Sequence, residues 1–407
     1  MLFSRLETKV ATDIIFYTAT TFVQKTSPFI VMNLAALELS SSEIGLYSYI
    51  LLIINFVQPF LGLELHRSIE FYFFKDKSKN NLFSSVLSTL FAFMLVSSIF
   101  AIILDSSFRI IDNLWTTMLP VYIFANIVYE IVLTNFRNIG DRKRYLIYNI
   151  GFTGVYMSLF LYFLTNDMME KTWLTMFIPL WITTIMFGII SLYYLRHSYE
   201  LRLCFSGVKK YIRFSLPFLL FLISSFIANN VDKYFAEKYL GMESLGILAM
   251  ALAYSSVIKF FSNAFMKSYT PIYFGTSQEH VNESKIYQKY FGWVIVTLTV
   301  LSSGALMLIF ALVLPDDYDE GIWLIPIISI AYLVRGFRQM FIPVIMKAEK
   351  TKYIGFEVVI IFVFGSSMAI LLVKNFGLIG AAISLVWIQA ISLLYYRFLN
   401  RYIINKD

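Results

Sequence analysis

The chain has 407 residues, of which 58% are hydrophobic, 18% aromatic and only 14% charged, and its mean hydropathy is +0.71. This composition excludes a soluble globular protein, because apolar runs of about 18 residues or more recur along the whole sequence. The formal net charge of +7 does not indicate nucleic-acid binding, since the basic residues follow the loops between apolar runs and do not form one basic face.

Twelve apolar segments long enough to cross a bilayer follow one another along the chain. We therefore predict an all-α polytopic membrane protein with about twelve transmembrane helices, near residues 12–37, 44–65, 82–104, 113–136, 145–165, 173–195, 212–231, 244–270, 289–314, 322–346, 353–373 and 376–397. The loops between them are short. The first residues lack the pattern of a cleaved signal peptide.

The charged loop residues are distributed unequally between the two sides of the predicted membrane. Most of the 33 lysines and arginines fall on the side that holds both termini. The opposite side holds Arg109, Lys171, Lys233, Lys238 and Lys374. Because cytoplasmic loops carry the excess of basic residues, we expect both termini in the cytoplasm.

The first half of the chain places charged residues inside predicted spans. Lys25 lies near the middle of the first span, among polar side chains. A charge at that depth costs about 3 kcal/mol or more, so Lys25 either binds an anionic substrate or pairs with an acid such as Glu64. Glu64 in the second span and Glu130 in the fourth are candidate counter-ions, or candidate sites for coupling to H+ or Na+.

Spans seven and eight carry a second group of polar residues. Asp232 and Lys233, toward the outer end of span seven, either pair with each other or leave Lys233 facing a cavity. Lys259 lies near the middle of span eight, and Asn263 is one helical turn further along the same face. We predict substrate contacts for Lys233, Lys259 and Asn263, and a coupling or counter-ion role for Asp232.

Span ten carries Arg335, Arg338 and Gln339 on one helical face. A guanidinium group can hold phosphate oxygens through two parallel hydrogen bonds, so both arginines are candidate substrate ligands. The alternative is a link between helices, with Glu130 or Glu357 as the partner. Glu357 in span eleven is also a candidate coupling residue.

A weak internal repeat relates the two halves. The sequence EIGL at 43–46 resembles SLGI at 244–247, each at the start of an even-numbered span. We predict two six-helix bundles, 1–200 and 201–407, related by a pseudo-two-fold axis along the membrane normal.

The sequence lacks the motifs of an enzyme. His66, His197 and His280 fall in or beside loops and have no metal-ligand spacing. There is no phosphate-binding loop and no nucleophile elbow, and the single cysteine, Cys204, excludes an intramolecular disulfide. We therefore expect no enzymatic activity, no cofactor and no metal site.

The segment 229–274 contains three recognisable patterns: DKYF at 232–235, YLGMESLGI at 239–247 and PIYF at 271–274. It resembles the Wzx-type polysaccharide flippases, which move O-antigen or capsule repeat units and belong to the MATE-like MOP exporter superfamily. That family commonly has Arg at the position of Lys233, a change that keeps the charge but removes the planar fork.

The resemblance implies a flippase that moves undecaprenyl-diphosphate-linked oligosaccharides from the cytoplasmic to the periplasmic leaflet of a bacterial inner membrane. It implies alternating access around a cationic cavity, H+ or Na+ coupling, and partners among the membrane lipids, the polysaccharide polymerase and the chain-length machinery. One alternative is a MATE-type drug or metabolite antiporter, in which acidic residues are expected at membrane depth. The other is an envelope polysaccharide polymerase or transferase, which would need a long external loop.

Overall fold

A computed structural model describes residues 27–108, 113–166, 170–274, 278–341, 343, 356–357 and 359–404. These residues form helices joined by short turns and contain no strand. Nine helical segments among them are long and apolar enough to cross a membrane. One of these, Ile361–Tyr402, bends at Gly377, whose φ of 58° is left-handed, and covers both predicted spans eleven and twelve. The predicted helical membrane fold is confirmed.

The chain divides into two compact units, and each is described by itself. The first contains Ile50–Ile223, and the second contains Pro28–Tyr49 together with Ser224–Asp407. The boundaries therefore fall inside two helices, α2 (Ser41–Gly62) and α8 (Val208–Leu240). The division at residue 200 that the repeat indicates stays a prediction.

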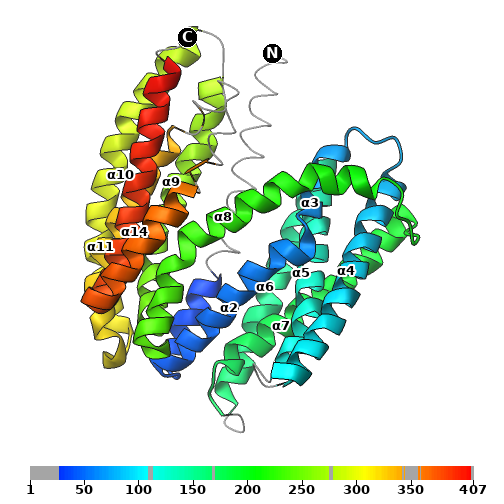
Figure 1. Cartoon of the computed structure of the whole chain (residues 1–407), viewed down its shortest axis with the longest axis horizontal. Coiled ribbons are helices and arrows are strands. Elements are labelled where there is room, and N and C mark those ends of the chain that lie inside the picture. The colour runs from blue at the N-terminus through cyan, green and yellow to red at the C-terminus, as the bar shows by residue number, and fades with distance from the viewer. Residues whose placement is uncertain are drawn as a thin grey trace. The chain divides into compact units, whose positions relative to one another are not determined.

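The first unit is built around one central helix. Its members are α3 (Leu65–Tyr72), α4 (Lys79–Phe108), α5 (Asn113–Ile139), α6 (Arg142–Thr165) and α7 (Leu174–Tyr199). The helix α5 packs against the other four (Figure 1). Its span is 72% buried, whereas that of α6 is 17% buried. The rest of the first unit therefore covers much less of α6 than of α5.

Within the first unit, polar side chains hold the beginning of α8 to the turn between α3 and α4. Lys210 Nζ donates a hydrogen bond to one carboxylate oxygen of Asp76 at 2.6 Å, and the Tyr211 hydroxyl donates to the other at 2.8 Å. The same ammonium group lies 4.1 Å above the ring of Tyr72. The α3–α4 turn and the start of α8 are therefore held together outside the apolar spans.

The second unit contains the helix Ser27–Ala36 from Pro28 onward. Its other elements are α9 (Met242–Phe274), α10 (Gln278–Val313), η1 (Asp316–Trp323), α11 (Leu324–Gln339), η2 (Ile361–Gly365) and α14 (Ser366–Ile404). The helix α11 packs against α9, α10 and α14. The turn η2 is π-helical and leads directly into α14.

Two glycines allow α2 and α9 to cross closely where each helix begins. A methyl group added at Gly45 would overlap the carbonyl oxygen of Met242, and one added at Gly246 would overlap the carbonyl oxygen of Ser41. Only glycine permits this approach, because any larger residue would separate the two backbones.

Candidate functional site

Six charged residues lie on helical segments of the second unit. Some of these segments pack against one another, and the others are linked through electrostatic interactions between their side chains. The cationic cluster, as we call it, consists of Asp232, Lys233, Lys259, Arg335, Arg338 and Glu357. Four of these residues are basic and two are acidic, so the cluster carries a formal net charge of +2. Each residue is buried or half-buried.

Arg338 on α11 is held by a network that reaches across to α14. Its guanidinium donates to Glu357 Oε1 and to the Ser392 hydroxyl, both at 2.9 Å. Ser392 also donates to Glu357 Oε1, and the Tyr396 hydroxyl donates to Oε2 at 2.6 Å. Glu357 therefore accepts hydrogen bonds at both oxygens. The link to Glu357 is one of the two interpretations that the sequence left open for Arg338.

The α9 face that bears Lys259 meets the α11 face that bears the two arginines. A hydrogen bond between side-chain amides joins them. Gln339 Nε2 donates to Asn263 Oδ1 at 3.0 Å. The approach is close because α11 carries Gly336 at this point, and an added methyl group there would lie 3.0 Å from the Ser262 hydroxyl. Lys259 is half-buried one turn before Asn263. The structure thus places side chains of spans eight and ten beside each other.

Asp232 and Lys233 lie on α8 near the boundary of the cluster. Asp232 is fully buried, and neither of its carboxylate oxygens accepts a hydrogen bond from a described side chain. It interacts electrostatically with Tyr332 of α11, and Tyr332 interacts in turn with Arg335. Lys233 Nζ donates to Asn230 Oδ1 at 3.2 Å. The α8 carboxylate is therefore linked to the same helix that carries both arginines.

The remaining candidates lie elsewhere. Lys25 falls outside the described residues. Glu64 is not inside a continuous span, because α2 ends at Gly62 and Glu64 precedes α3 in a left-handed conformation, with φ of 52°. It accepts a hydrogen bond from Arg67 Nε at 3.0 Å. Glu130 is half-buried on α5, in the first unit.

Two residues of the network had not been singled out from the sequence. Ser392 and Tyr396 are four positions apart, so they share a face of α14. Two hydroxyl side chains at this spacing in an apolar helix are the sequence pattern that could have indicated them. Serine and tyrosine are common in membrane helices, however, so the pattern indicates a polar contact only once Glu357 is known to lie beside it.

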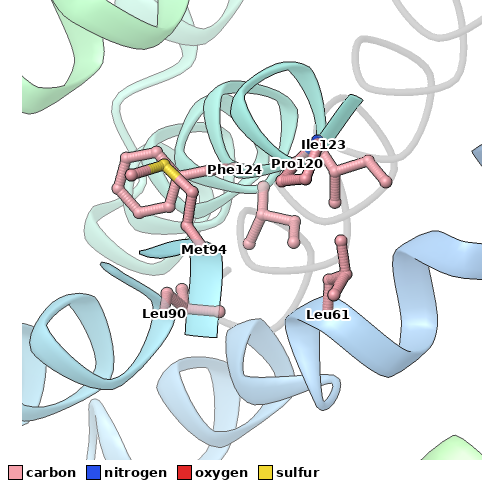
Figure 2. Close-up of a pocket in the computed structure, with 7 residues that line it drawn as sticks. Leu61, Leu90, Met94, Pro120, Ile123 and Phe124 are labelled. Atoms are coloured by element: carbon pink, nitrogen blue, oxygen red, sulfur yellow. The ribbon is translucent and has the colours of Figure 1, made fainter. Parts of the chain in front are cut away.

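The first unit has a small apolar cavity that cannot hold a charged substrate. Figure 2 shows Leu61, Leu90, Met94, Pro120 and Ile123 around it. Its volume is about 10 Å³, which leaves room for about one water, and its walls offer no polar side chain. No group of three or more potential metal ligands occurs in the described parts of either unit.

No protein-family model and no curated protein sequence matches the chain. Solved structures do resemble it. The lipid II flippase MurJ, in an inward closed conformation, aligns with a TM-score of 0.72 and 15% identity, over 95% of this chain and 87% of MurJ.

A multidrug-resistance MATE transporter of the MOP superfamily, in an outward-facing conformation, aligns with a TM-score of 0.63 and 13% identity, over 97% of this chain and 96% of that one. A MOP-superfamily transporter from Pyrococcus furiosus, described as having a binding pocket of reversed polarity, aligns with a TM-score of 0.57 and 14% identity, over 96% and 94%. The chain is thus a multi-pass membrane protein with the helical, two-unit fold of MOP-superfamily transporters.

Proposed function

We propose that the chain is a flippase that moves a lipid-linked anionic oligosaccharide, of the undecaprenyl-diphosphate class, from the cytoplasmic to the periplasmic leaflet by alternating access. The similarity in fold to MurJ supports transport of a lipid-linked substrate, and the resemblance of the segment 229–274 supports the polysaccharide branch. On this proposal the protein lies in a bacterial inner membrane with both termini in the cytoplasm. It serves a pathway with a polysaccharide polymerase and chain-length machinery.

The cationic cluster is the observation that carries the proposal. A bare charge at membrane depth is costly, and a chain with no anion to bind would gain nothing from a surplus of basic groups there. A diphosphate carries negative charge that this surplus can compensate during the crossing. A transporter of cationic drugs would instead be disfavoured by the net charge of +2 that this cluster carries.

Within the cluster, Arg338 and its neighbours take different roles. Glu357, Ser392 and Tyr396 orient the Arg338 guanidinium, which leaves its position fixed before any ligand arrives. Lys259, Arg335 and Lys233 supply further positive charge, and Asn263 supplies an amide for hydroxyl or phosphate oxygens. Lys25, outside the described residues, stays a predicted substrate contact of span one.

Coupling to an ion gradient is assigned to Asp232. Its carboxylate is fully buried and lacks a described side-chain donor, so a proton or Na+ would stabilise it there. Glu357 is saturated by three donor groups and serves as the counter-ion of Arg338. Glu64, which is paired with Arg67, and Glu130 are the weaker candidates for coupling.

The test is polysaccharide export in a strain that lacks the gene. Complementation with the wild-type chain should restore surface polymer, and loss of the gene should trap single lipid-linked repeat units in the cytoplasmic leaflet. Lys259→Ala and Arg335→Ala should each reduce export at normal protein level. Lys143→Ala, which removes an exposed cation at the start of α6, is the matched control.

Three results would contradict the proposal. Repeat units that reach the periplasmic face without being polymerised would indicate a polymerase. Unchanged surface polymer with increased sensitivity to cationic drugs would indicate a MATE-type exporter. Full export by the Lys259→Ala and Arg335→Ala double variant would remove the cationic cluster from the mechanism.

A further inference from the structure

The segment that joins α7 to α8 lies extended along the first turns of α4. This linker, Glu200–Gly207, is held through its backbone by a row of serines on α4. Ser84 Oγ accepts from the Arg202 N–H at 3.2 Å, and Ser88 Oγ accepts from the Cys204 N–H at 3.1 Å. Ser85 Oγ donates to the Ser206 carbonyl at 2.6 Å. The serine row therefore satisfies polar groups of a non-helical backbone.

The side chains of the linker are unlike those of an ordinary solvated loop. Leu203 is 85% exposed and Phe205 is 60% exposed. The segment follows the apolar span Leu174–Tyr199 directly and lies against the beginning of the span Lys79–Phe100. Irregular backbone is tolerated near hydrocarbon only when its polar groups are bonded within the protein. Bonded backbone and outward apolar side chains together indicate contact with lipid.

A groove of about 260 Å³ opens under this linker, within the first unit. Leu87 and Phe91 of α4, Phe124 of α5 and Leu192 of α7 form its apolar walls. Its volume is somewhat below that of a pocket for a drug-sized ligand, about 300 Å³ or more. The groove is therefore suited to part of a single hydrocarbon chain.

One charged side chain, Arg202, belongs to the groove lining. It is 82% exposed, and its guanidinium lies 3.9 Å from the exposed carboxylate of Glu200. Exposed ion pairs of this length contribute little, so the guanidinium remains available to a stronger anion. A phosphate can accept two parallel hydrogen bonds from it.

We propose that this groove binds an anionic phospholipid from the leaflet that the linker faces. One acyl chain occupies the apolar groove, the headgroup phosphate contacts Arg202, and Leu203 and Phe205 lie among neighbouring acyl chains. A zwitterionic lipid fills the groove equally well but lacks the net negative charge. The site is separate from the cationic cluster and does not depend on the transported substrate.

The test uses the full chain in vesicles with one fluorescent label. Cys204→Ser removes the only cysteine, and Leu203→Cys introduces a bimane label at an exposed position that lines the groove. Vesicles contain phosphatidylglycerol or phosphatidylcholine bearing a doxyl quencher on the acyl chain. One basic residue near an anionic lipid is worth about 1 kcal/mol, which is about fivefold in affinity. Half-quenching should need about fivefold less phosphatidylglycerol than phosphatidylcholine.

Substitutions of the two charged residues test whether Arg202 causes the preference for the anionic lipid. Arg202→Gln should abolish the preference for phosphatidylglycerol, and Glu200→Gln should keep or increase it. Arg144→Gln, at an exposed arginine on α6 that is absent from the groove, should change nothing. Because Glu200→Gln and Arg202→Gln remove opposite charges from one exposed pair, a shared folding defect would affect both in the same direction.

Three outcomes would overturn the proposal. Absence of quenching by either lipid would place the linker in water. Equal quenching by both lipids in the wild-type background would leave a lipid-facing segment without an anion site. Displacement of the labelled phosphatidylglycerol by an equimolar amount of unlabelled polyprenyl phosphate would assign the groove to a lipid-linked chain.

Discussion

Replacement of Glu357 by alanine should destabilise the second unit more than the loss of a single hydrogen bond in the Arg338 network. The Glu357 side chain is 9% exposed and that of Arg338 is 15% exposed, so water cannot readily replace the lost carboxylate. Removal of one partner of a buried ion pair costs about 3–5 kcal/mol, because the other charge is left uncompensated. Loss of one hydrogen bond between membrane helices costs much less, about 0.6 kcal/mol and at most about 1.7 kcal/mol.

Tyr396→Phe provides the matched comparison, since it removes one donor to Glu357 and keeps both charges. Unfolding can be followed by SDS titration of the protein in mixed micelles, with the fluorescence of its 6 tryptophans as the signal. Glu357→Ala should lower the free energy of unfolding at least twice as much as Tyr396→Phe. The double variant Arg338→Met with Glu357→Met should recover most of the loss, because it removes both charges.

Equal losses for Glu357→Ala and Tyr396→Phe would refute this reasoning. They would mean that the Arg338 charge is compensated by water or by another anion after the carboxylate has gone. Arg338 would then be accessible in the resting protein, and its fixed orientation could not be attributed to Glu357.

Three further predictions concern other parts of the chain. Gly45→Ala should destabilise the second unit by about 1–3 kcal/mol, since the added methyl group forces apart two backbones in contact, and SDS titration will measure it. Asp76 has a pKa below its ordinary value: burial alone would raise it, but hydrogen bonds from Lys210 and Tyr211 and the lysine charge outweigh burial. A carboxylate with a depressed folded-state pKa stabilises above its unfolded value and loses that contribution at lower pH, so Asp76→Asn should be less stable than wild type at pH 7 and should approach it below about pH 4. Finally, Ser85→Ala should speed maleimide labelling of Cys204, because Ser85 holds the linker through Ser206.

Each of these predictions has an internal control or a contradicting result. Gly154→Ala should not destabilise the protein, because an added methyl group meets nothing within 4 Å there and alanine favours the helix more than glycine does. A stability difference for Asp76→Asn that persists unchanged at pH 3 would rule out the carboxylate as its source. Ser97→Ala removes a hydroxyl that donates within α4 and should leave the labelling rate unchanged. An equal acceleration by this variant would show that the serine row does not restrain the linker.

The sequence predicted the helices well because their signal is local. Apolar runs mark the spans, and i, i+3 and i+4 spacing places Arg335, Arg338 and Gln339 on one face without knowledge of any neighbour. Partners across helices were harder, because they depend on the register in which helices pack. Glu357 was named as one of two acids for Arg338, and packing of α11 against α14 decides between them. Ser392 and Tyr396 were missed for the same reason.

At the end of α2 even the local sequence pattern predicts the wrong helix boundary. Leu63 and Leu65 extend the apolar run past Gly62, so the predicted span included Glu64 between them. The helix nevertheless stops, because Leu63 and Glu64 adopt left-handed conformations that open the turn to α3. Neither residue is a glycine or an asparagine, which are the usual signals for such a turn. The position of Glu64 outside a continuous helix therefore has no sequence signature.

The contact between Gly45 and Gly246 has a consequence for how the two halves of the chain relate. Gly45 meets Met242 and Gly246 meets Ser41, so equivalent positions of the repeat face each other reciprocally. Reciprocal contacts of this kind are isologous, as in a symmetric homodimer. The start of each helix thus presents a surface that is complementary to itself. A chain that contained only one copy of the repeat could therefore form a homodimer through the same glycine.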